Sequence, residues 1–105
     1  MRIIELDGSA WKTPLDFVQS LYEGIGQGYP HGMNPAAFVD SMIRRGMGGV
    51  EPPYTVKVIN LKDAPKEVTE YVSMMISVIK EARQERLASQ GVDIEVSISA
   101  LDLSN

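Results

Sequence analysis

The chain alternates short apolar runs with longer stretches of helical periodicity, and turn-forming residues separate them. A first apolar run predicts a strand over residues 2–6, which stops at the turn-forming pair Asp7-Gly8. Residues 54–60 and 92–99 each alternate between apolar and polar side chains. Alternation with a period of two is typical of strands, so we predict a second and a third strand there.

A first helix is predicted to begin at Thr13-Pro14, because threonine is a good N-cap and proline fits the first helical position. It runs into the glycine-rich segment 24–32, which holds four glycines and one proline. Its apolar positions recur at helical spacing and are Leu15, Val18, Leu21, Tyr22 and Ile25. Trp11 precedes this helix and is expected to staple its start.

Two further helices follow by the same reasoning. Asn34 and Pro35 begin the second helix, which ends at the glycines that start with Gly46. The third helix is the longest and covers about residues 65–89 before Gly91 closes it. One continuous stripe along this helix, apolar except for its last residue, is Val68, Tyr71, Val72, Met75, Ile79, Ala82 and Arg86.

The order strand, helix, helix, strand, helix, strand predicts an α/β fold. Helical crossovers between strands favour a parallel sheet, and two alternating strands favour a sheet covered on one face. We therefore expect one domain over residues 1–105, with a three-stranded parallel sheet packed in two layers against three helices. The polar tail 101–105 is expected to fray.

Composition narrows the class of protein. The hydrophobic fraction is 44% and the charged fraction 23%, as in ordinary soluble domains, and there is no cysteine for a disulfide or a thiolate site. No apolar stretch has the length of a membrane span or of a signal peptide, so we expect a cytoplasmic protein without membrane contact. The net charge of −4 disfavours nucleic acid and favours a basic partner.

The glycine-rich segment could cradle a phosphate, but its spacing argues against this. Gly24, Gly26 and Gly28 are followed by Tyr29, so the dinucleotide-binding pattern is incomplete. The segment also follows a predicted helix, whereas that pattern follows a strand. A connection between two helices is the better interpretation, and no cofactor is expected.

His31 is the only histidine and could act as a general base oriented by Asp40. Neither a nucleophile nor an oxyanion motif accompanies it, so catalysis is the minor alternative. One histidine also cannot build a histidine-based metal site. By helical spacing alone, Asp40 would simply pair with Arg44 four residues later.

The long helix carries an acidic face opposite its apolar stripe. Glu67, Glu70, Glu81 and Glu85 lie roughly along one side. Glu81 and Glu85 are like charges four residues apart, which is mildly unfavourable for the helix and compatible with a surface kept for a basic partner. A solvated charged face is the commoner explanation.

Together, three segments resemble the barstar family of intracellular inhibitors of the ribonuclease barnase. They are residues 3–8, with the opening strand and its Asp-Gly turn, residues 29–40, and residues 81–83 followed by 91–94, where the long helix leads into the last strand. The second resembles the family's aromatic-Gly-x-Asn signature, with an aspartate six residues after the asparagine. The segments span nearly the whole chain in the family's order and imply the two-layer fold with three parallel strands described above.

The resemblance implies a bacterial immunity protein that is a monomer when free and binds and inhibits a basic ribonuclease. The second helix and the loop before it would plug the active site of the nuclease. By position, Asp40 would take the place of the substrate phosphate. Glu81 would make a second acidic contact on the long helix, with Glu85 beside it.

The loop before the second helix holds the other implied contacts. Tyr29 and His31 fall where the family places aromatic contacts, while Gly32 and Asn34 shape the loop and cap the helix.

The chain also departs from the family at its binding face. Ala36 replaces a second aspartate, Val39 replaces an aromatic residue, and the loop over residues 44–51 is longer and carries Met47. The face is therefore less acidic. A non-inhibitory protein-interaction or regulatory module on the same scaffold stays open as the alternative.

Overall fold

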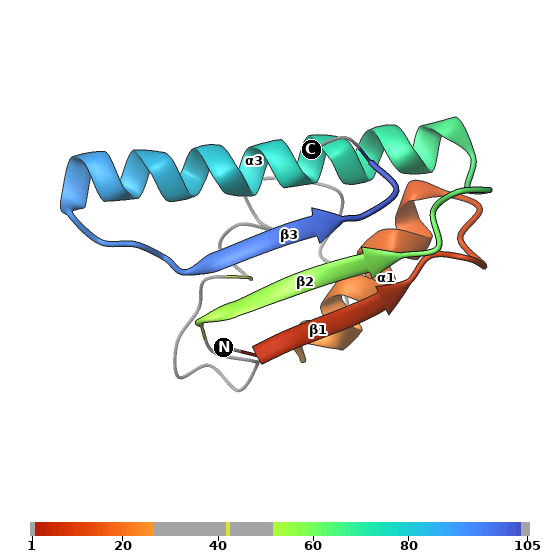
Figure 1. The fold of residues 1–105 in the computed structure, drawn as a ribbon, viewed down its shortest axis with the longest axis horizontal. Coiled ribbons are helices and arrows are strands. Elements are labelled where there is room, and N and C mark those ends of the chain that lie inside the picture. The colour runs from red at the N-terminus through yellow and green to blue at the C-terminus, as the bar shows by residue number, and fades with distance from the viewer. Residues whose placement is uncertain (1, 27–41, 43–51, 104–105) are drawn as a thin grey trace.

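Three parallel strands and two helices make up the part of the chain that the structure describes, which is residues 2–26, 42 and 52–103 of a computed structural model. Figure 1 shows α1 behind the sheet and α3 running alongside β3. The elements are β1 (Arg2–Asp7), α1 (Pro14–Ile25), β2 (Tyr54–Ile59), α3 (Lys66–Gln90) and β3 (Val96–Ala100).

The sheet has the order β1-β2-β3, and both neighbouring pairs are parallel. Both crossovers step across the sheet in the same direction, and right-handed crossovers of that kind place their helices on the same face. The predicted α/β class and three-stranded parallel sheet are confirmed. The predicted helix between Asn34 and Gly46 lies outside the described residues except for Met42, which is buried.

Each strand separates a buried face from an exposed one. On β2, Tyr54, Val56 and Val58 are fully buried beneath the helices. The side chains between them point to the opposite face, where Lys57 stands exposed opposite Glu5 of β1. The register also places Thr55 beside Ser97, and their hydroxyl oxygens are 2.9 Å apart. The prediction that one face of the sheet lacks a covering layer therefore agrees with the exposed residues of all three strands.

The turn after β1 is tightly packed around Gly8. Its main-chain N–H donates to the carbonyl of Ile59 at 2.8 Å, which joins the ends of β1 and β2. A Cβ at this position would lie 2.6 Å from Leu61 Cδ2 and 2.9 Å from Trp11 Cε3. Only glycine fits without displacing these side chains, which gives the Asp7-Gly8 pair a packing reason beyond the turn itself.

α1 begins where the sequence predicts. The carboxylate of Asp16 accepts hydrogen bonds from the main-chain N–H groups of Lys12 and Thr13, at 2.8 and 3.0 Å. Trp11 is buried and lies against Phe17, with the two ring centroids 5.3 Å apart. The prediction that Leu15 belongs to the buried face of α1 is wrong, because its side chain is 44% exposed. The buried face passes through Phe17 instead.

α3 is packed on the core only over its first half. Val68, Val72, Met75 and Ile79 are its buried residues. The predicted stripe continued to Ala82 and Arg86, but these side chains are only half-buried. Figure 1 shows why the burial ends: the C-terminal part of α3 projects beyond the start of β3, where the sheet offers no further surface.

β3 begins later than predicted, at Val96 rather than Val92. The carboxylate of Asp93 accepts two hydrogen bonds from Arg83 and one from the main-chain N–H of Glu95. Glu95 has a φ of 57°, which belongs to the left-handed region. These contacts turn the chain and hold it against α3, so the apparent alternation over residues 92–95 does not produce a strand.

The chain after β3 is held in place as far as Leu103, contrary to the expected fraying. The carboxylate of Asp102 accepts a hydrogen bond from the main-chain N–H of Leu61 at 2.8 Å. Leu103 packs against the core, and its N–H donates to the carbonyl of Ala100. No helix among residues 2–26 and 52–103 is both long and apolar enough to span a membrane.

Two tyrosine hydroxyls below the sheet have opposite surroundings. The hydroxyl of the buried Tyr54 donates to the main-chain carbonyl of Met42, which ties Met42 to the central strand. The hydroxyl of Tyr71 on α3 is buried and has no hydrogen-bond partner among the residues that the structure describes. Burial raises the pKa of both groups, so both hydroxyls stay protonated at neutral pH.

We expect Tyr54→Phe to lower the free energy of unfolding by roughly 1–3 kcal/mol, because it leaves the Met42 carbonyl buried without its donor. Tyr71→Phe is the matched control, since it removes a hydroxyl that makes no hydrogen bond, and we expect it to be neutral or slightly stabilising. Urea denaturation followed by tryptophan fluorescence measures both. Equal losses in the two variants would contradict this account of Tyr54.

Candidate interaction surfaces

Most of the interface predicted from the sequence lies outside the described residues, and so does the alternative pair of His31 and Asp40. The structure thus places two members of the predicted set, Glu81 and Glu85, both on α3. The seven that lie outside it are Tyr29, His31, Gly32, Asn34, Ala36, Asp40 and Met47.

Glu81 and Glu85 stand exposed on the projecting half of α3. Neither forms an ion pair with a residue of the described ranges. Their acidic companions nearer the start of the helix, Glu67 and Glu70, are exposed as well, and Glu70 pairs with Lys66 at 3.6 Å. The predicted acidic face of the long helix is therefore open to solvent along its described length.

The carboxyl ends of the parallel strands are where α/β proteins commonly bind ligands, but the polar groups here fasten loops. Asp7 accepts hydrogen bonds from the main-chain N–H of Ser9 and from the side-chain amide of Asn60, and these lower the pKa of its carboxyl. Asp102 accepts from Leu61 in the same region. Over the described ranges, no cluster of three or more acidic or histidine side chains is placed to hold a metal ion.

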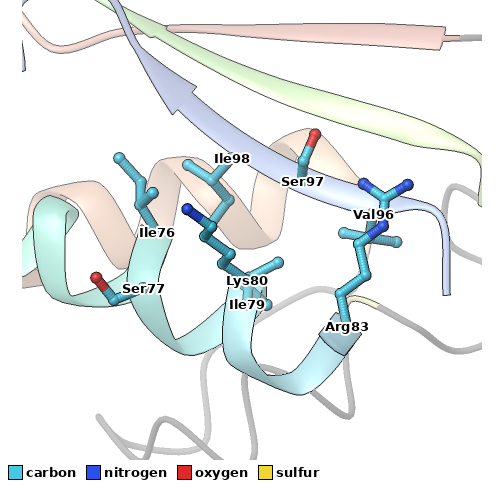
Figure 2. A pocket seen from close by; sticks show the side chains of 8 residues that line it. All are labelled: Ile76, Ser77, Ile79, Lys80, Arg83, Val96, Ser97 and Ile98. Carbon is cyan, nitrogen blue, oxygen red and sulfur yellow. The ribbon is translucent and has the colours of Figure 1, made fainter. Parts of the chain in front are cut away.

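A groove between α3 and β3 was not predicted from the sequence. It has a volume of about 280 Å³, and Figure 2 shows the side chains that line it from both elements. Its walls combine aliphatic side chains with a few polar ones, and its residues are Ile76, Ser77, Ile79, Lys80, Arg83, Val96, Ser97 and Ile98. The sequence signal would have been the spacing of Ile76, Lys80 and Arg83 on one side of the helix, next to an edge strand.

The two cations of the groove differ in their surroundings. Arg83 donates through Nε and Nη2 to the two carboxylate oxygens of Asp93, at 2.6 and 2.9 Å. The hydrogen bonds from Arg83, and then the one from the Glu95 N–H, hold the pKa of Asp93 below its ordinary value. Lys80 makes no such pair with any residue in the described part of the chain. Among the described residues, the positive charge of the groove that no carboxylate compensates is therefore that of Lys80.

Comparison with known proteins gives no relative: no protein-family model, curated protein or solved structure matches the chain.

The pair of Arg83 and Asp93 makes the free energy of unfolding depend on pH in the acidic range. The pKa of Asp93 in the folded state lies below the ordinary value of 3.8. The stability that its ionised carboxylate contributes is therefore complete above pH 3.8 and is lost as the pH falls through the folded-state pKa. We expect Asp93→Asn to be less stable than the wild type near neutral pH. The difference should shrink at an acidic pH below the folded-state pKa of Asp93, where the wild-type carboxyl is also protonated.

Urea denaturation of both proteins at the two pH values measures this effect. Asp63→Asn is the control, because it removes an exposed carboxylate that accepts no hydrogen bond from a described residue. A stability difference for Asp93→Asn that stays constant from neutral to acid pH would show that the carboxylate charge does not contribute.

Proposed function

We propose that this chain binds and inhibits a basic ribonuclease by covering its active site with acidic side chains. The observation that carries the proposal is the exposed pair Glu81 and Glu85 on the projecting half of α3, at the positions where the barstar resemblance expects an acidic contact. Two exposed carboxylates four residues apart repel each other mildly within one helix. A cationic partner would relieve that repulsion.

The fold supports the same proposal. The resemblance implies a two-layer α/β domain with three parallel strands, and the described elements have that sheet in the order β1-β2-β3. The net charge of −4 adds a long-range attraction to a basic protein, which raises the rate of association. An inhibitor that protects the cell producing the nuclease acts in the cytoplasm as a monomer, and we include both features in the proposal.

The chemistry of inhibition follows from charge. A ribonuclease active site gathers cationic side chains around the phosphate of its substrate, and a carboxylate can take the phosphate's place. Asp40 has that role in the proposal, and Glu81 forms a second contact from α3. Tyr29 and His31 would pack beside the cationic site. This accounts for inhibition without any chemical step on the inhibitor.

A protein-interaction module without a nuclease target is the second candidate. It is favoured by Ala36, which makes the predicted binding face less acidic than the family pattern, and by Val39, which replaces an aromatic residue there. The same exposed acids on α3 would then bind another basic protein. Loss of ribonuclease activity on addition of the chain separates the two candidates, because a module of this kind would bind without inhibiting.

The central test is Asp40→Ala, used for capture of partners from the native host and for inhibition of any ribonuclease recovered. Removing a carboxylate at the centre of such an interface should weaken binding by at least about 30-fold. Binding is measured by calorimetry and inhibition by cleavage of a fluorogenic oligonucleotide. If the same partners bind both proteins with equal affinity, plugging by Asp40 is wrong.

A second test concerns α3. Glu81→Lys should weaken binding by roughly five- to tenfold, mostly through the association rate, because it replaces an attraction by a repulsion at an exposed site. Glu67→Lys makes the same charge change about 20 Å away on the same helix and should have a much smaller effect. Stopped-flow association rates at low and high salt measure both. Equal rates for the two variants would exclude a specific contact at Glu81.

A further inference from the structure

The outer edge of β3 has main-chain groups that do not pair with the rest of the sheet. The N–H of Tyr54 donates to the carbonyl of Glu95 at 3.1 Å, and Tyr54 lies opposite Val96 in the register. When parallel strands pair in this register, the main-chain groups of residues 95, 97 and 99 form the hydrogen bonds to β2. The N–H and C=O groups of Val96 and Ile98 therefore point away from β2, toward the groove.

The groove beside this edge combines the features that a bound extended chain requires. α3 forms one wall with Ile76 and Lys80, and Ile98 of β3 lies opposite (Figure 2). Aliphatic side chains supply apolar contact. The edge, whose outward main-chain groups at Val96 and Ile98 bond to no described residue, supplies hydrogen-bonding groups in a row. Extended peptides bind proteins in this way, by adding a strand to a sheet edge next to a helix, with affinity from main-chain bonds and selectivity from side chains.

The charge of the groove selects the occupant. Asp93 compensates Arg83, and Glu95 adds further negative charge beside it, whereas Lys80 has no described counter-ion. A second copy of this chain, paired edge to edge through β3, would bring two Lys80 side chains to the same interface. That repulsion disfavours a dimer and favours a chain that brings a carboxylate.

We propose that the groove between α3 and β3 binds an extended segment of a partner protein, with an aliphatic side chain against Ile76 and Ile98 and an acidic side chain paired with Lys80. Lys80 stands between Ile76 and Arg83, within the groove and not at its end (Figure 2). The carboxylate therefore comes from a glutamate or aspartate inside the segment, not from a chain terminus. This surface is separate from the one proposed to contact a ribonuclease.

The test is an NMR titration of the full chain with an acetylated, amidated heptapeptide of alternating valine and glutamate. The matched valine–lysine heptapeptide is the control. We expect the acidic peptide to shift the amide resonances of Val96 and Ile98 and to slow their hydrogen exchange, because both amides gain a hydrogen bond. Lys80→Glu should weaken binding by roughly five- to tenfold. Lys62→Glu has the same net charge but lies outside the groove and should bind as the wild type does.

Each other outcome overturns the proposal. Equal binding of the two peptides, or equal weakening by both lysine variants, would mean that Lys80 does not select a carboxylate. Shifts confined to residues outside β3 and α3, or no shift at the highest soluble peptide concentration, would mean that the edge does not accept a strand. Slow exchange at Val96 and Ile98 in the free protein, together with a dimer in sedimentation velocity, would assign the edge to a second copy.

Discussion

One-sided burial of the central strand β2 is the constraint on which the structure depends. Its inward side chains, Tyr54, Val56 and Val58, are fully buried, and both helices cover that face. Because each strand alternates with a period of two, the same register places hydroxyls and charges together on the other face. The hydrogen bond from Tyr54 to Met42 adds the buried Met42 to the covered side.

This architecture could be predicted because its signals are local and repeated. Alternation identified β2, the Thr13-Pro14 start identified α1, and element order gave the parallel sheet. The errors arose where a distant contact decided the outcome. The pair of Arg83 and Asp93 prevents the early start of β3, and the sheet ends before it can bury Ala82. Neither contact leaves a periodic signal in the sequence.

The interaction surfaces were harder to predict than the fold. The exposure of Glu81 and Glu85 follows from helical spacing against the apolar stripe of α3, and their placement is as expected. The groove beside β3 depends on which strand lies at the edge and on how far α3 stands from it. Both are properties of the assembled sheet, so the spacing of Lys80 with Ile76 and Arg83 on one side of the helix does not by itself predict a groove.

The projecting half of α3 has a consequence for how this protein can change over evolutionary time. Beyond Ile79 no side chain of the helix is fully buried, so substitutions on its exposed side change the free energy of unfolding little. Selection for stability acts strongly on the first half of the helix and, apart from Arg83 with its bond to Asp93, weakly on the second. New recognition properties can therefore accumulate on exposed residues such as Glu81 and Glu85 while the domain continues to fold, which separates the residues that specify the structure from residues free to acquire new partners.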